Sequence, residues 1–196
     1  MIAAMIIGLT RFLVGGTGLW LGCVPSVRQR IYFANHSSHL DTIIVWAAMP
    51  SDLRRRVRPV AAADYWGQGR FRRYIALKVL NAVLVDRQVR SSNPLAPLED
   101  ALREGDSLII FPEGTRGLER LPSAFKGGLY HLAREFKEVE LVPVFLDNLR
   151  RALPKGSLVP VPISCIARFG APIALAGGET KPKFLERARE AVEALA

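Results

Sequence analysis

The chain has 196 residues, of which 49% are hydrophobic and 23% are charged, values that exclude a disordered protein and suit one folded domain with a sizeable core. Lysine and arginine outnumber aspartate and glutamate 27 to 18, giving a formal net charge of +9 that favours anionic partners such as phospholipid surfaces, phosphate-bearing substrates or nucleic acid. The two cysteines, Cys23 and Cys165, have no CxxC spacing, so we interpret them as buried thiols in a reducing compartment.

The first 24 residues differ from the rest of the chain because their only charged side chain is Arg11. Their length allows a bilayer-spanning helix, whereas Arg11 near the middle would cost about 2.5–3.5 kcal/mol at the bilayer centre. We expect residues 1–27 to form an apolar, membrane-associating helix, embedded or interfacial, with an ordinary buried helix as the alternative. The stretch lacks the preceding basic residues of a signal peptide. If it spans the bilayer, Arg28 and Arg30 place the following domain on the cytoplasmic side.

Strand-like and helix-like stretches alternate over residues 28–196, which we expect to form one domain. Strands are predicted at residues 29–35, 57–63, 82–85, 107–111, 141–146 and 163–169. Helices are predicted to start near Ser38, as the cap, and near Asn93, and to cover residues 65–80, 127–136 and 183–195. Pro143 favours an edge position or a bulge for its strand. The alternation predicts an α/β fold, a single domain with a largely parallel sheet flanked by helices.

The segment Asn-His-Ser-Ser-His-Leu-Asp at residues 35–41 joins the first of these strands to a helix. His36 falls in the loop and Asp41 in the first helical turn, so the carboxylate can reach back to the imidazole. A carboxylate on one ring nitrogen fixes the tautomer of a histidine that accepts a proton at the other, and a general base is typically worth about 10²–10⁴-fold in rate. A hydrogen-bonded loop at a helix start is the alternative interpretation.

A metal site would combine His36, His39 and Asp41 as a facial triad of two imidazoles and one carboxylate. The two histidines are three residues apart across a strand-to-helix turn, so they need not face one point. No second carboxylate cluster accompanies them. We therefore expect no metal.

A second motif, Leu-Ile-Ile-Phe-Pro-Glu-Gly-Thr-Arg-Gly at residues 108–117, begins in a buried strand. Just past the carboxyl end of that strand lie Glu113, Gly114, Thr115 and Arg116, and ligand sites in open α/β sheets lie outside that edge. Gly114 lets a ligand approach the backbone closely, and Arg116 offers the planar fork that suits a phosphate. An exposed turn is the alternative interpretation.

Two further cations lie at ends of predicted elements. Arg87 follows the strand at residues 82–85, and Lys126 lies at the start of the helix at residues 127–136. A cation and the free backbone amides of a helix start can share an anion. Each feature is ordinary when it is taken alone.

Four segments, taken in order, closely resemble the four sequence blocks of the glycerolipid acyltransferase family, which includes the 1-acylglycerol-3-phosphate acyltransferases. They are residues 35–41, 85–87, 111–116 and 142–144, and the resemblance extends over about residues 30–150. It implies an O-acyltransferase that moves a fatty acyl group from a thioester of coenzyme A or acyl carrier protein to a hydroxyl of a lysophospholipid. Attack of the hydroxyl on the thioester needs a base and stabilisation of the oxyanion that forms. It needs neither a metal nor a cofactor.

The resemblance also assigns roles to individual residues. His36 is the general base and Asp41 is its partner. The residues expected to bind substrate are Arg87, Glu113, Gly114, Thr115, Arg116 and Lys126. Gly117 stands where the family commonly has serine, which leaves the acceptor open: 1-acylglycerol-3-phosphate is the default, and glycerol 3-phosphate or a lyso-aminolipid are alternatives.

We expect the protein to work at the cytoplasmic face of a membrane, with an anionic lipid surface as partner. Val24 and His36 are 12 residues apart, which limits their separation to roughly 40 Å. Two other functions stay open: a metal-dependent phosphohydrolase built on the histidine and aspartate cluster, and a non-catalytic protein that binds anionic lipid through residues such as 54–56. Nucleic acid is not an expected partner, because no recognition motif occurs and the amino terminus is hydrophobic.

Overall fold

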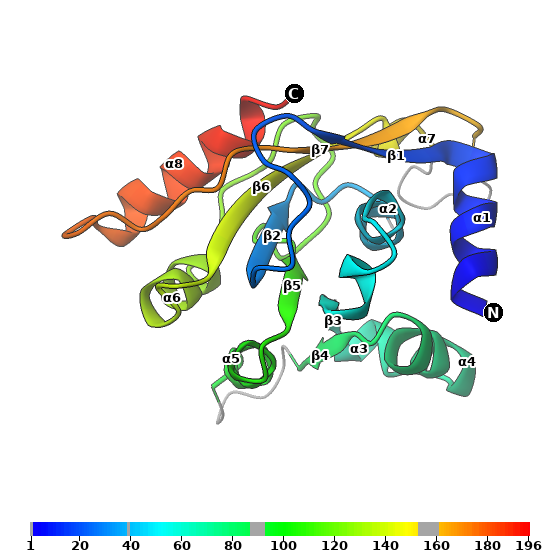
Figure 1. Ribbon diagram of the computed structural model, residues 1–196, viewed down its shortest axis with the longest axis horizontal. Helices are drawn as coiled ribbons and strands as arrows, with labels where there is room; N and C mark the ends of the chain where they lie inside the picture. Colours follow the sequence, from blue (N-terminus) through cyan, green and yellow to red (C-terminus); the bar gives the residue numbers. More distant parts are fainter. Residues whose placement is uncertain (1, 39, 87–92, 153–160) are drawn as a thin grey trace.

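The computed structural model describes residues 2–38, 40–86, 93–152 and 161–196, which build one α/β unit around a seven-stranded sheet (Figure 1). The strand order is β1-β7-β6-β2-β5-β3-β4. Neighbouring strands are parallel except β6 and β7, which are antiparallel. The prediction of a single α/β domain with a largely parallel sheet is confirmed, with this one antiparallel junction.

The elements follow the predicted strands to within two residues at each end. The strands are β1 (Gly15–Trp20), β2 (Arg30–Ala34), β3 (Val57–Ala62), β4 (Val83–Val85), β5 (Ser107–Ile110), β6 (Glu140–Asp147) and β7 (Cys165–Phe169). The helices are α1 (Ile2–Val14), α2 (Asp41–Ala48), α3 (Ala63–Trp66), α4 (Arg70–Tyr74), α5 (Ala96–Arg103), α6 (Gly128–Glu135), α7 (Leu149–Ala152) and α8 (Lys181–Glu193). Two single turns complete them, the 3₁₀ turn η1 (Leu53–Arg55) and the π-helical turn η2 (Ile75–Val79). Among the strands only β1 was not predicted, and among the helical elements α7 and η1 were not.

The sheet separates two hydrophobic layers (Figure 1). β2 and β5 are buried at every position, as expected of central parallel strands covered on both faces. α1 and α2 pack on one face around Ile44 and Trp46, and α5, α6 and α8 pack on the other around Leu129 and Phe184. Because β2, β3, β4, β5 and β6 run in the same direction, their carboxyl ends meet at one edge of the sheet.

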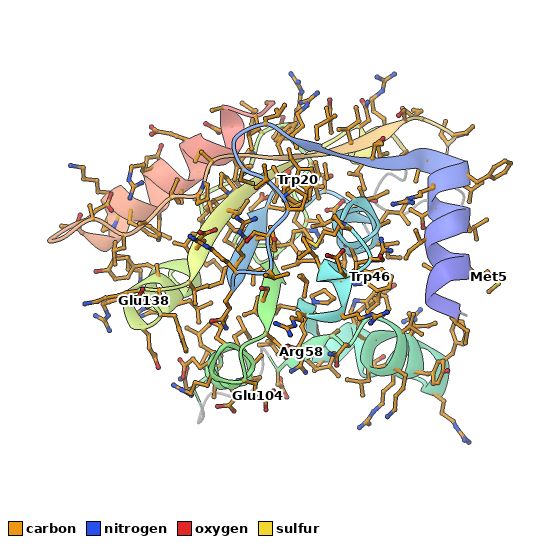
Figure 2. The ribbon with its side chains drawn as sticks, in the orientation of Figure 1. Met5, Trp20, Trp46, Arg58, Glu104 and Glu138 are labelled. Atoms are coloured by element: carbon orange, nitrogen blue, oxygen red, sulfur yellow. The ribbon has the colours of Figure 1, made fainter. Side chains whose placement is uncertain are left out.

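The apolar amino-terminal segment is divided between a helix and a strand, which corrects the expectation of one helix. α1 ends at Val14, and Gly15 and Gly16 have φ of 74° and 59°, a conformation that favours glycine. The chain then enters β1, where Trp20, which Figure 2 labels, lies beside β7. Its ring stacks on that of Phe169, with ring centroids 3.9 Å apart. Among the residues that the structure describes, no helix is both long enough and apolar enough to cross a bilayer.

Arg11 is accommodated by the domain itself. Its Nη2 donates a hydrogen bond to the carbonyl oxygen of Ala47 at 2.9 Å, and Arg54 donates to the carbonyl oxygen of Met49 at 2.6 Å. Both carbonyls lie at the carboxyl end of α2, where cations satisfy free acceptors and complement the helix dipole. The cost that we considered for Arg11 at a bilayer centre therefore does not arise in this arrangement.

The predicted helix at residues 65–80 is interrupted. Gly69 has φ of 79°, and the segment at Gly67–Gly69 separates α3 from α4, which continues into η2. A positive φ cannot be part of a right-handed helix. The break makes α4 a separate element at the end of the molecule that also carries α1 (Figure 1).

Pro143 lies inside the sheet, in β6 between β7 and β2, so the predicted edge position is wrong. Its carbonyl oxygen accepts a hydrogen bond from the amide of Gly170 at 2.9 Å, just past β7. The nitrogen and the carbonyl of one strand residue face the same neighbour, so the nitrogen of Pro143 also faces β7. The register of β6 and β7 starts at Val144 and Phe169, so Pro143 stands opposite Gly170. Proline has no N–H for the reciprocal hydrogen bond of that pair, so one bond is lost at the end of the ladder.

Candidate active site

A cleft of about 1070 Å³ opens at the carboxyl ends of β3, β4 and β5. Its polar lining includes His36 and Ser38 after β2, Gly114 and Arg116 after β5, and Lys126 before α6, together with acidic residues such as Glu99 and Glu135. Much of the remaining wall is apolar and includes Val60, Val85, Leu95, Leu98, Ile110 and Leu129. Apolar walls with a few convergent polar groups are typical of ligand sites, and this combination fits an amphipathic ligand.

His36 and Asp41 are brought together as predicted. His36 follows β2, Asp41 opens α2, and His36 Nδ1 lies 2.8 Å from Asp41 Oδ2. The same oxygen accepts hydrogen bonds from the backbone amides of Ser37 at 2.6 Å and Ser38 at 2.9 Å. With a carboxylate as its partner, Nδ1 carries the hydrogen, and Nε2 is the nitrogen left to a substrate.

Local packing fixes the plane of the imidazole. The His36 ring stacks on Phe111 at the end of β5, with centroids 4.4 Å apart and an interplanar angle of 24°. Asp41 is fully buried, so its carboxylate cannot swing away into solvent. Ser38 is not the cap of α2, whose cap position is Leu40. Its hydroxyl instead accepts a hydrogen bond from the Leu40 amide at 3.2 Å, which tightens the turn between the two catalytic candidates.

Glu113 is buried behind the cleft and is 5% exposed. Its Oε1 accepts a hydrogen bond from the backbone amide of His36 at 2.7 Å. Its Oε2 accepts two, from the amide of Ser123 at 2.9 Å and from the Ser123 hydroxyl at 2.7 Å. The amide of Gly117 donates to the carbonyl oxygen of His36 at 2.8 Å. The turn after β5 therefore holds both backbone polar groups of His36, which favours a positioning role for Glu113 over the predicted contact with substrate.

Gly114 makes room for Lys126 in the lining of the cleft. It has φ of 72°, and a Cβ added there would lie 2.5 Å from Lys126 Nζ. The Lys126 amide donates to the carbonyl oxygen of Pro112 at 2.8 Å, which fixes the start of the approach to α6. Arg116 lines the same cleft and is half-buried. The two cations can together bind an anion beside His36.

Of the residues that the sequence singled out, one lies outside this constellation and two are not placed. Thr115 is exposed and does not line the cleft. Arg87 and His39 lie outside the described residues, so the structure does not place them. Among residues that it does place, no group of three or more histidine, cysteine, aspartate or glutamate side chains could hold a metal ion.

Two supporting residues were missed by the sequence analysis. Ser123 anchors Glu113, and nothing in its surroundings signals that role. Asn35 is buried and its side chain bonds both backbone groups of Leu146, accepting from the amide at 2.7 Å and donating to the carbonyl at 3.2 Å. It ties the end of β2 to β6, and its place at the head of the 35–41 motif was the available signal.

Cys165 is buried in β7. Burial raises the pKa of its thiol to about 11, and the negative charges of Asp41 and Asp147 act in the same direction. A thiol in such surroundings stays protonated and is a poor nucleophile. Cys165 is therefore not a candidate nucleophile, and the imidazole of His36 stays the candidate base.

Residues 23–147, which contain every candidate site residue, match the family described as Acyltransferase. The chain belongs to this family. Over 177 residues it is 28% identical to a 1-acyl-sn-glycerol-3-phosphate acyltransferase of Limnanthes alba, covering 82% of this chain and 59% of that protein. Over 154 residues it is 30% identical to the 1-acyl-sn-glycerol-3-phosphate acyltransferase of Cocos nucifera, covering 74% and 46%. The resemblance to glycerolipid acyltransferases is thereby confirmed.

The chain spans about half the length of these curated relatives. Its fold is similar to the crystal structure of the 1-acyl-sn-glycerophosphate (LPA) acyltransferase from Thermotoga maritima, with a TM-score of 0.75 and 21% sequence identity. That likeness covers 99% of this acyltransferase family member and 78% of the other chain. The shared fold therefore includes α1 and β1 as well as the region of the family match.

Proposed function

We propose that this acyltransferase family member transfers a fatty acyl group from an acyl thioester to a hydroxyl of a lysophospholipid. 1-Acylglycerol-3-phosphate is the proposed acceptor, and coenzyme A or acyl carrier protein carries the donor. The observation that carries the proposal is the His36–Asp41 pair, whose histidine lines a largely apolar cleft. The relatives from Limnanthes alba and Cocos nucifera are both 1-acyl-sn-glycerol-3-phosphate acyltransferases, which supports the same acceptor here.

In the proposed reaction His36 is the general base. Its Nε2 takes the proton of the acceptor hydroxyl while the hydroxyl oxygen attacks the thioester carbonyl carbon. The imidazolium that forms is stabilised by Asp41, whose Oδ2 holds Nδ1 at 2.8 Å. Collapse of the tetrahedral intermediate breaks the carbon–sulfur bond, and the departing thiolate takes the proton back from Nε2. The products are an ester and a free thiol, and His36 is neutral again.

The lining of the cleft suits both parts of the acceptor. Arg116 and Lys126 both line it, and there a guanidinium can pair with phosphate oxygens through two hydrogen bonds while an ammonium adds a point charge. The apolar wall offers a surface on which acyl chains leave water. A phosphate-bearing acceptor would thus present its hydroxyl beside His36.

The proposal includes association with the cytoplasmic face of a membrane through α1. Met5, Leu9 and Phe12 are 67%, 57% and 86% exposed, whereas Ile7 and Val14 of the same helix are buried against the domain. A helix that offers a separate apolar face to the surroundings is typical of proteins that lie in the bilayer interface. Lipid substrates would then reach the cleft from the membrane to which the protein is bound.

A transfer assay with a labelled acyl thioester and a panel of acceptors tests this function. The panel contains 1-acylglycerol-3-phosphate, glycerol 3-phosphate, a neutral lysophospholipid and a lyso-aminolipid. The wild-type protein is expected to form labelled phosphatidate at the highest rate, and His36→Ala is expected to form almost none. Transfer to none of the four acceptors, or undiminished transfer by folded His36→Ala, would show that the proposed function is wrong.

A further inference from the structure

α4 is exposed along its whole length, although two of its five residues are aromatic. Phe71 is 76% exposed and Tyr74 is 47% exposed. The other three residues are Arg70, Arg72 and Arg73, and each of them is exposed as well. Aromatic side chains exposed together and surrounded by basic residues are typical of a surface that another body covers.

The charge around α4 has one sign. Lys78 in the following turn η2 is also exposed, and no acidic residue occurs between Gly67 and Leu80. A run of cations that contains no acidic residue attracts an anionic partner. We call α4 together with Lys78 the basic–aromatic helix.

The basic–aromatic helix and the apolar face of α1 belong to the same end of the molecule. α1 and α4 lie at the same end of the molecule (Figure 1), and Met5 projects outward there (Figure 2). A lipid bilayer has both properties that this end requires: an apolar interior for the α1 face and, where anionic lipids are present, negative headgroups for the arginines. An acidic protein would satisfy the arginines alone.

The basic–aromatic helix also touches the rim of the cleft. Tyr65 and Trp66 of α3 line the cleft, and the guanidinium carbon of Arg72 lies 4.7 Å from the centroid of the Tyr65 ring. A contact of this length is a cation–π interaction. A membrane that binds α4 would therefore lie next to Tyr65 and Trp66, the part of the cleft through which a lipid acceptor would reach His36.

We propose that the basic–aromatic helix is a docking element for anionic phospholipid headgroups, which holds the rim of the cleft against the membrane. Its arginines pair with headgroup phosphates, and Phe71 and Tyr74 insert at the depth where amphipathic rings lie in bilayers. The proposal rests on the proposed function, because holding the cleft at the membrane helps the reaction only if the substrate is a lipid that comes from that membrane.

Flotation of the whole chain with vesicles tests the proposal. One set of vesicles is pure phosphatidylcholine, and the other contains phosphatidylcholine with phosphatidylglycerol. A basic residue near an anionic surface is worth about fivefold in partition coefficient, so Arg70→Gln with Arg73→Gln is expected to lower binding to the anionic vesicles by about 25-fold. Binding to the neutral vesicles should stay the same, and high salt should remove the difference between the two proteins.

A matched control removes the same number of charges from the other end of the molecule. Lys137, just after α6, and Lys183 in α8 are both exposed, and both elements lie at the opposite end from α4 (Figure 1). Lys137→Gln with Lys183→Gln is expected to bind anionic vesicles as the wild type does. Phe71→Ser is expected to bind both kinds of vesicle less well, because it removes the ring that enters the bilayer.

Three outcomes would overturn the proposal. One is unchanged binding of the Arg70 and Arg73 variant to anionic vesicles, and another is an equal loss in the lysine control, which would make net charge the cause. The third is a raised KM of the Arg70 and Arg73 variant for an acyl donor carried on acyl carrier protein, while its vesicle binding is unchanged. That result would make acyl carrier protein, which is acidic, the partner of the basic–aromatic helix. Because flotation measures binding alone, an absence of acyl transfer by the wild type would refute the proposed function without altering these results.

Discussion

The carboxylate of Glu113 holds the backbone of His36, with Oε1 at 2.7 Å from the amide nitrogen. The imidazole of the same residue is held by Asp41, so two buried carboxylates from different parts of the chain fix the candidate base at its backbone and at its ring. Leaving a buried donor without its partner typically costs about 1–3 kcal/mol. Glu113 is therefore expected to determine where the base lies rather than what it binds.

Glu113→Gln is expected to lower kcat by about 10- to 100-fold, because a misplacement of the base by about 1 Å can have an effect of that size. The amide keeps one acceptor oxygen, and its NH₂ group must face either the His36 amide or the donors of Ser123. The KM values of both substrates should change little. Steady-state kinetics with each substrate varied in turn measures the effect on kcat and on each KM separately.

Ser123→Ala is the matched control for this variant. It removes the hydroxyl that donates to Oε2 at 2.7 Å but leaves the backbone amide at 2.9 Å. Its kcat should therefore lie between those of the wild type and Glu113→Gln. A raised KM for the acceptor with kcat unchanged in Glu113→Gln would instead support the direct substrate contact that the sequence predicted.

Asp41→Asn is expected to fold and to lose about 10²- to 10⁴-fold in turnover. The amide oxygen can replace Oδ2 as acceptor for Ser37 and Ser38. The NH₂ group then takes the place of Oδ1, which is buried and has no hydrogen-bond partner among the described residues. The negative charge that stabilises the imidazolium is lost. Thermal unfolding checks the fold and single-turnover kinetics checks the chemistry; near-normal turnover would remove Asp41 from the mechanism.

The sequence predicted the strands after residue 28 because local signals determine them: buried strands read as continuous apolar runs, and proline or glycine follows the ends of β5 and β7. It did not predict β1. The partner of β1 is β7, about 150 residues further along the chain, and local composition contains no information about that pairing. The interior position of Pro143 was missed for the same reason, since it depends on where the ladder with β7 begins.

The site shows the same division. His36 and Asp41 are five residues apart, so spacing alone predicted their contact. The hydrogen bonds from His36 and Ser123 to Glu113 join three loops, and their existence follows from the order of β2 and β5 in the sheet rather than from any motif. Sequence therefore identified the residues of the site better than it identified their roles.

Arg116→Lys is expected to raise the KM of the acceptor while sparing that of the thioester. Lysine keeps the charge but loses the planar fork that pairs with two phosphate oxygens. Loss of a charged hydrogen bond is typically worth about 1.5–3 kcal/mol, or roughly 10- to 150-fold in kcat/KM. Arg87→Lys, outside the described residues, tests the other predicted phosphate ligand. If either variant raised only the KM of the thioester, the arginine that it replaces would belong to the donor site.

Alkylation of the native protein with iodoacetamide at pH 8 is expected to leave Cys165 unmodified. Its pKa of about 11 leaves about one thiol in a thousand as the reactive thiolate, and the side chain is fully buried. Mass spectrometry of the native and the unfolded protein measures the difference. Rapid native labelling at Cys165 would contradict both the burial and the raised pKa.

The raised pKa of the Cys165 thiol predicts that the free energy of unfolding depends on pH. Its pKa is raised from 9.0 in the ordinary environment to about 11 in the folded protein, so the folded state holds this proton more tightly than the unfolded state does. The contribution to stability is complete below about pH 9 and is lost as the pH rises toward 11. Urea unfolding across this range should show a smaller decline for Cys165→Ala than for the wild type, and equal declines would refute the prediction.

The two faces of α1 are expected to respond differently to a polar substitution. Leu9 and Phe12 face outward and Ile7 faces the core. Burying a large apolar side chain is worth about 1.5–3 kcal/mol, so Leu9→Ser with Phe12→Ser should lower partition onto neutral phosphatidylcholine vesicles by about 100-fold or more and leave the Tm nearly unchanged. Ile7→Ser should instead lower stability by about 2–5 kcal/mol, because it opens a cavity and buries a hydroxyl. Vesicle flotation and thermal unfolding of both variants separate the two effects, and unchanged flotation of the Leu9 and Phe12 variant would show that the membrane contact lies elsewhere.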